Sequence, residues 1–373
     1  MCLNSLIHYI HLAKAGKLSE AATLFFETFG RQIHYQFGNY TLEIELLSSL
    51  FEDKDYKKSK LNTNELIGPL LNQLASAYTL SGQPLRATSL MIMALDKLES
   101  NNDLAIGLGN LARSQLDIGA LEDAEHSVQH SLDLSRKNSD YFIKAYGHHA
   151  LAQVLSYCGK WYEAKQEQDQ TLSLMEKTPE IQALGNIWSY RALSFLLIAR
   201  SGQSTDENIE AAITSATRAL KLANETKQKQ ANVPRDYVRA YWLLGASYRQ
   251  SGNIADAEIN LTEAIISDRT INMVDVEANI LLDIARLRYD QKNYEEAKSL
   301  AEEALSITER CGYVLQGADV NLFLAQYALE QEQDKAKAKE YAEEARKLAT
   351  CDGPPYYYKV AYEEAERMLE NLK

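Results

Sequence analysis

The 373-residue chain contains few residues of the kinds that interrupt or cross-link a fold. Six prolines and 17 glycines are too few for the many turns of an all-β protein. Four cysteines, Cys2, Cys158, Cys311 and Cys351, are scattered without Cys-x-x-Cys spacing, so neither a disulfide framework nor a zinc site is indicated. This cysteine usage favours a reducing, cytoplasmic location.

Long apolar runs and basic tracts are also missing. No stretch approaches 18 consecutive apolar residues, and the first 12 residues lack the apolar region of a signal peptide. The formal net charge is −13, from 39 Lys and Arg against 52 Asp and Glu. An acidic surface repels phosphate backbones and anionic lipids, so we expect neither nucleic acid nor membranes among the partners.

Motifs of catalysis and cofactor binding are absent as well. The chain has no P-loop, no Gly-x-Gly-x-x-Gly after a strand, no Gly-x-Ser-x-Gly and no His-Glu-x-x-His. His148 and His149 are adjacent, and neighbouring residues on a helix diverge by about 100°, so they cannot readily chelate one ion together. We therefore expect a protein that is not an enzyme and holds no metal and no cofactor.

The chain is organised around a two-helix unit, seen best at residues 237–267 (YVRAYWLLGASYRQSGNIADAEINLTEAIIS). Two amphipathic helices are separated by a turn that contains Gly252. Gly245 on the first helix and Ala257 on the second leave room for close approach, while Tyr248 and Leu261 fill the volume beside them. One such hairpin cannot bury its own apolar face, so copies of it are required.

Copies recur along the chain, at intervals of about 37 to 48 residues from Ala87 onward. The second-helix alanine is found, in chain order, at Ala21, Ala87, Ala124, Ala164, Ala212, Ala257, Ala297 and Ala338. Gly82, Gly119 and Gly159 fall where first helices end, a position that needs the left-handed conformation. The apolar residues follow helical rather than alternating periodicity, which predicts an all-α fold.

Several segments depart from the repeat. Residues 31–51 predict an irregular helix pair, in which Leu46, Leu47 and Leu50 share one apolar face, and residues 53–64 predict an exposed loop. Residues 200–206 predict an expanded turn and residues 224–234 a polar loop. The two prolines of the CDGPP segment end a helix, and a last helix follows from about residue 356.

The aromatic, Leu-Gly, Tyr and later Ala of residues 237–267 resemble a tetratricopeptide repeat (TPR) hairpin. The resemblance implies a right-handed superhelical solenoid of about seven to eight helical hairpins with a C-terminal capping helix. We expect a single solenoid over residues 1–373. It divides into divergent N-terminal hairpins (1–64), the TPR array (65–350) and the capping helix (354–373).

In TPR solenoids the first helices line a concave groove, and the resemblance places a set of side chains on it. These candidate ligand-binding residues are Arg113, His149, Gln153, Arg191, Arg239, Trp242, Arg249, Asn279, Arg286 and Tyr289. Arginine presents a planar fork to carboxylates and stacks on rings, so the groove would take an acidic or aromatic-bearing peptide or protein segment. The alternative is that these arginines form structural ion pairs with Asp236, Asp290 or Asp319.

Longer segments resemble the C-terminal TPR sensor region of bacterial STAND (signal-transduction ATPase) NTPases. They include RDYVRAYWLLGASYRQSGNIADAEINLTEAI and the closing CDGPPYYYKVAYEEAERML. The resemblance implies that a trigger binds the sensor and that an N-terminal NTPase and effector module, absent from this chain, responds. The predicted function is the ligand-sensing domain of a STAND signalling or defence protein. The alternatives are a stand-alone TPR adaptor and a peptide-pheromone-binding regulator.

Overall fold

The computed structural model describes residues 3–52, 56, 61, 64–136 and 140–373. Within these residues the all-α prediction is confirmed, since no strand forms and Gly353 and Tyr356 are joined only by an isolated bridge. The predicted loop at residues 53–64 falls almost wholly outside the described residues, as does Cys2.

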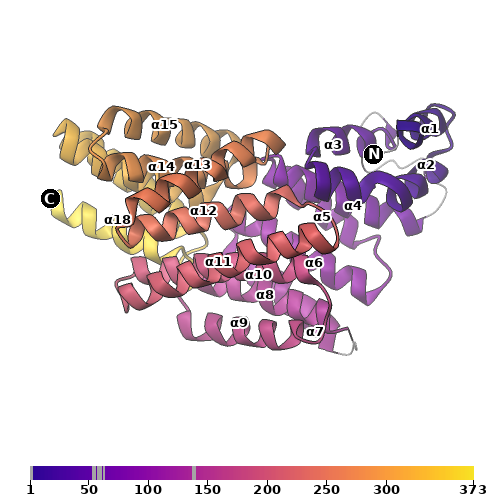
Figure 1. Ribbon diagram of the computed structural model, residues 1–373, viewed down its shortest axis with the longest axis horizontal. Coiled ribbons are helices and arrows are strands. Elements are labelled where there is room, and N and C mark those ends of the chain that lie inside the picture. Colours follow the sequence, from indigo (N-terminus) through magenta and orange to yellow (C-terminus); the bar gives the residue numbers. More distant parts are fainter. Residues whose placement is uncertain (1–2, 53–55, 57–60, 62–63, 137–139) are drawn as a thin grey trace.

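Most helices are paired in consecutive hairpins that wind around the molecule (Figure 1). Each pair is a first and a second helix: α1 (Leu3–Lys14) and α2 (Leu18–Leu24), α4 (Asn64–Leu80) and α5 (Pro84–Leu95), α6 (Asn101–Asp117) and α7 (Leu121–Arg136), α8 (Tyr141–Tyr157) and α9 (Trp161–Met175), α10 (Ile181–Arg200) and α11 (Thr205–Lys229), α12 (Pro234–Gln250) and α13 (Ile254–Ile271), α14 (Val274–Asp290) and α15 (Tyr294–Cys311), and α16 (Val314–Tyr327) and α17 (Lys335–Thr350). The short π-helix η4 (Ala328–Glu332) extends α16, and α18 (Lys359–Asn371) follows the last pair.

The α12–α13 hairpin shows why this sequence folds as it does. A Cβ added to Gly245 would lie 2.5 Å from Cγ of Leu261, so only glycine allows the two helices to pack this closely. Gly252 has φ of +79° in the turn, a value that is favourable for glycine. Asn253 is the N-cap of α13, and its side chain accepts a hydrogen bond from the backbone N–H of Asp256 at 3.3 Å.

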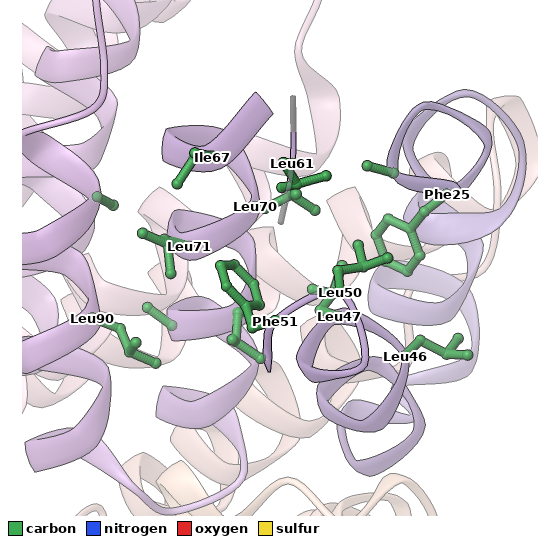
Figure 2. Close-up of a cluster of buried hydrophobic side chains, with 14 of the residues drawn as sticks. Phe25, Leu46, Leu47, Leu50, Phe51, Leu61, Ile67, Leu70, Leu71 and Leu90 are labelled. Carbon is green, nitrogen blue, oxygen red and sulfur yellow. The ribbon is translucent and has the colours of Figure 1, made fainter. Parts of the chain in front are cut away.

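The N-terminal segment is less regular, as predicted. After α2 the chain forms two π-helices, η1 (Phe25–Phe29) and η2 (Gln32–Phe37), and then α3 (Tyr40–Ser48). Leu46, Leu47 and Leu50 are buried, as their shared face predicted. Figure 2 shows this cluster, in which α3 and the residues after it pack against the side chains of α4.

One predicted loop is wrong. Residues 224–229 continue α11 to Lys229 instead of forming part of a polar loop. The segment holds good helix formers and neither glycine nor proline, and Thr226 within it is buried, so packing and propensity both favour helix. The expanded turn is likewise shorter than predicted, because α11 already begins at Thr205. The last helix begins at Lys359, three residues later than expected.

Turns of the first half of the chain pack against helices of the second half. A Cβ on Gly82 would lie 2.7 Å from Val274 at the start of α14, and one on Gly119 would lie 2.6 Å from Val314 at the start of α16. α6 likewise contacts α16 and α4 contacts α14. The winding therefore brings first helices from distant repeats around a common interior. The division into residues 1–64, 65–350 and 354–373 stays a prediction.

Candidate functional site

The interior contains a cavity of about 430 Å³, here called the first cavity. Its wall is formed by the first helices α4, α6, α8, α10, α12 and α14, and by η2 of the irregular N-terminal segment. Asparagine, glutamine, arginine and tyrosine side chains are interspersed there with apolar ones such as Ile106, Phe142 and Ile187.

Two arginines of the first cavity share one buried carboxylate. Nη2 of Arg113 and Nη2 of Arg239 each lie 3.3 Å from Oδ2 of Asp275, although residues 113 and 275 belong to distant repeats. Both guanidinium groups also lie near the ring of Tyr190, with centroid distances of 5.1 and 5.9 Å, a cation–π arrangement. Arg239 donates a further hydrogen bond to Oδ1 of Asn186 at 3.2 Å.

A third arginine, Arg235, is held by η2. Its Nη1 donates to Nε2 of His34 at 3.1 Å, and its guanidinium lies 4.4 Å from the ring centroid of Tyr35. Because arginine only donates, Nε2 of His34 must be the acceptor and Nδ1 carries the proton. That Nδ1 lies 2.9 Å from Glu43, which also accepts a hydrogen bond from Gln73 at 2.5 Å.

Neutral hydrogen-bonding groups complete the polar wall. Tyr146 donates to Oδ1 of Asn110 at 2.6 Å, and Nδ2 of Asn110 donates to Oδ1 of Asn72 at 3.2 Å. His149 and Gln153 are hydrogen-bonded at 2.8 Å. Burial, together with the positive charges of Arg113 and Arg239, lowers the pKa of His149 to about 3, so this imidazole is neutral near pH 7. Amide groups of this kind can pair with the backbone of a bound peptide.

A second cavity of about 660 Å³ lies between later repeats and α18. Three of its four lining arginines have carboxylate partners of their own, and the fourth, Arg367, is exposed on α18. Arg249 is 2.9 Å from Asp290, and Nη2 of Arg200 lies 2.9 Å from Asp319 and 2.7 Å from Glu364. Tyr289 also lines this cavity and donates to Glu330. Its arginine charges are largely neutralised from within the chain.

The structure divides the predicted groove residues between these cavities. Arg113, His149, Gln153 and Arg239 line the first cavity, and Arg249, Arg286 and Tyr289 line the second. The five arginines thus do not share one surface.

Three predicted residues line neither cavity. Arg191 pairs with Asp169 at 3.0 Å, Trp242 is buried and donates to Asp283 at 2.8 Å, and Asn279 is half-buried on α14. Ion pairing, the alternative considered for the arginines, is found for all five of them. Arg249 uses the expected Asp290, whereas Asp319 pairs with Arg200 and Arg286 pairs with Asp283 at 3.0 Å.

Sequence reasoning missed several residues of the first cavity wall. His34 and Tyr35 come from the irregular segment, which has no repeat pattern to align. Arg235 could have been found, since it precedes Arg239 by four residues and therefore shares its helix face.

The described residues also bear on metal binding and on membrane insertion. No group of three His, Cys, Asp or Glu side chains that could hold a metal ion occurs in the part of the chain that the structure describes. In the same part, none of the helices combines the length and the apolar character needed to cross a bilayer.

Comparisons with known proteins identify the fold. A tetratricopeptide repeat family model matches residues 278–310. The structure of a Rap protein complexed with Competence and Sporulation Factor is similar over 100% of this chain and 99% of that one, with 13% identity and a TM-score of 0.60. A STAND protein with a TPR sensor from Pyrococcus horikoshii is similar over 89% of this chain, with 17% identity and a TM-score of 0.51.

The present chain spans only 48% of that STAND protein. No curated protein matches the sequence. The protein is an all-α tetratricopeptide repeat solenoid, and the predicted fold class is confirmed.

Proposed function

We propose that the protein is a non-catalytic module that binds a protein or peptide segment in the first cavity. The observation that carries this proposal is the cavity itself, enclosed by the first helices of six hairpins. Its volume of about 430 Å³ lies within the range of roughly 300–1,000 Å³ common for ligand sites. Its wall combines apolar surface with a few converging polar groups, the composition that such sites require.

The wall chemistry favours a peptide over a purely apolar ligand. Asn72, Asn110 and Gln153 offer donors and acceptors that a peptide backbone can satisfy. The arginines and tyrosines suit an acidic or aromatic-bearing side chain.

More specifically, we propose that this module is the ligand-sensing part of a cytoplasmic STAND signalling or defence protein. The resemblance of its repeats and the likeness in fold to the STAND sensor support this. An NTPase and effector module would then act outside the present residues. Ligand binding would favour one spacing of the repeats over another and so be transmitted along the solenoid.

A free-standing peptide-binding regulator or adaptor is the second candidate. It is favoured by the end-to-end similarity to the Rap protein, which leaves neither chain with a large unmatched part. Reading the coding DNA upstream of the Met1 codon separates the two. An open frame that continues into a P-loop ATPase supports the sensor, and an in-frame stop supports the free-standing protein.

Binding in the cavity is tested with synthetic hexapeptide mixtures, measured by fluorescence anisotropy. The double variant Asn110→Ala with Tyr146→Phe removes the hydrogen bond between two wall residues and should weaken binding about tenfold. The control is Tyr162→Ala, because Tyr162 is 71% exposed on α9 and lines neither cavity. Equal affinity of the double variant and the wild type would exclude the first cavity as the binding site.

A further inference from the structure

Arg235 is the least neutralised arginine of the first cavity. Arg113 and Arg239 are each 3.3 Å from Asp275, whereas the nearest carboxylate to Arg235 is Asp236, at 4.0 Å. Both oxygens of Asp236 already accept from Gln182, at 2.9 and 3.0 Å. Among the described residues the one hydrogen-bond acceptor of Arg235 is the neutral ring of His34.

The residues that line the cavity include more arginines than carboxylates, although the protein is acidic. Among its described lining residues, three arginines stand against one carboxylate, Asp275. Glu43 lies behind the wall, bound to His34 and Gln73, which are both wall residues. Asp117, 3.5 Å from Arg113, and Asp236, 4.0 Å from Arg235, also lie behind it, so the excess positive charge is confined to the lining residues. An anionic ligand group would balance the excess.

The guanidinium of Arg235 is oriented for a further partner. The ring of Tyr35 supports its face, and His34 takes one hydrogen of Nη1. Nη2 then remains without a hydrogen-bond partner among the described residues, while the side chain as a whole is only 14% exposed. A preorganised arginine with free N–H groups in a sheltered cavity binds a carboxylate more strongly than an exposed one does.

Repulsion between neighbouring arginines also destabilises the empty cavity, and an anionic ligand would reduce it. Arg235 and Arg239 are four residues apart on α12, and both line the same cavity, so their charges repel each other. Asp275 pairs with Arg239 and Arg113 through Oδ2, whereas the carboxylate nearest to Arg235 is Asp236, at 4.0 Å. A ligand carboxylate beside Arg235 supplies the missing counter-charge.

We propose that Arg235, oriented by His34 and Tyr35, binds a carboxylate of the peptide ligand, either an acidic side chain or the C-terminal carboxylate. This rests on the proposed function, because it assigns the chemistry of the group that enters the same cavity. The carboxylate would lie at the η2 end of the cavity, and the rest of the peptide would extend along the amide groups of α4, α6 and α8.

The first test uses two pairs of hexapeptide mixtures. One pair differs in a fixed Glu or Gln, and the other in a free-acid or amidated C-terminus. We expect the wild type to bind one charged mixture about tenfold or more tightly than its neutral counterpart, as expected for a hydrogen-bonded charge pair. A preference for Glu identifies a side-chain carboxylate, and a preference for the free acid identifies the C-terminus.

Variants of single arginines show which side chain causes the preference for the charged mixture. Arg235→Gln should abolish the preference, since its amide can still donate to His34 but carries no charge. Arg235→Lys keeps the charge without the planar fork and should retain part of it. Arg249→Gln removes an arginine of the second cavity and should leave the preference unchanged. A preference that survives Arg235→Gln would overturn the proposal.

A second measurement separates this inference from the proposed function. Equal binding of charged and neutral mixtures overturns the carboxylate site and leaves peptide binding intact. If no mixture binds, the proposed function fails, and glutarate decides on the carboxylate site alone. Glutarate should raise the unfolding temperature of the wild type above that in sodium chloride of equal ionic strength, and not that of Arg235→Gln. If the wild type unfolds at the same temperature in glutarate and in sodium chloride, the carboxylate site is overturned.

Discussion

Both cavities of the solenoid are lined by several arginines, but they differ in how closely carboxylates pair with those arginines. In the first, Arg113 and Arg239 share Asp275, and Arg235 has no carboxylate closer than 4.0 Å. In the second, each of Arg200, Arg249 and Arg286 has a carboxylate within 3.0 Å. Arg367 also lines the second cavity but is exposed on α18, so the first cavity differs in holding a sheltered arginine, Arg235, without a close carboxylate.

Distant repeats meet at both cavities, and in the second Arg200 of α10 contacts Asp319 of α16 and Glu364 of α18. The wall of the first is completed by distant repeats that touch, with the turn at Gly82 packed against Val274 next to Asp275. The turns at Gly202 and Gly252 have no atom within 4 Å of an added Cβ. Contact between superhelical turns thus positions the carboxylate that the first cavity shares.

The largest effect is expected from Asp275→Asn. Asp275 is 1% exposed and pairs with two arginines. Its loss leaves the buried Arg239 without an ion-pair partner among the described residues and leaves Arg113 with Asp117 alone, so it should cost about 3–5 kcal/mol of unfolding free energy. The matched change in the second cavity, Asp290→Asn, breaks a partly exposed pair and should cost about 1 kcal/mol or less. Urea denaturation measures both. Similar costs for the two variants would contradict the comparison.

A smaller effect is expected from Gly82→Ala. Both Gly82 and Gly252 have φ near +80°, which costs an alanine about 1–2 kcal/mol. At Gly82 the new Cβ would also lie 2.7 Å from Val274, which adds about 1–3 kcal/mol of overpacking. Gly252→Ala is the control, and adding Val274→Ala to Gly82→Ala should recover part of the loss. Equal unfolding free energies for Gly82→Ala and Gly252→Ala would show that the contact between turns carries little strain.

An effect that changes with pH is expected from Asp268→Asn. Burial, together with the negative charges of Glu277 and Asp275, raises the pKa of Asp268 to about 9, so this carboxyl does not neutralise Arg239 at pH 7. A carboxyl with a raised pKa binds its proton more tightly when folded. Its contribution to stability is therefore complete below about pH 4 and is lost as the pH rises toward 9.

Denaturation between pH 5 and 8.5 checks this sign. The wild type should lose stability relative to Asp268→Asn as the pH rises, by at most about 1.4 kcal/mol per pH unit. A difference between the two proteins that stays constant over this range would mean that Asp268 is ionised in the folded state.

Local features of the molecule could be predicted from the sequence. Helical periodicity, the small residues Gly245 and Ala257 and the turn glycines act on residues close in the chain, so their pattern determined the hairpins. The resemblance to TPR hairpins, rather than periodicity, placed Arg113, His149 and Arg239 on inward faces. Local reasoning was wrong about the polar loop, because the burial of Thr226 depends on neighbouring helices that no local pattern describes.

Only the tertiary structure decided which groups meet. The pairing of Arg113 with Asp275 and of His34 with Arg235 joins residues 162 and 201 positions apart. In a solenoid each repeat packs on its neighbours with a small rotation, and these rotations accumulate until distant repeats meet. The repeat pattern determines that the chain forms a superhelix of stacked hairpins. The accumulated angle determines where the first cavity closes, and with it which arginine is left for a ligand.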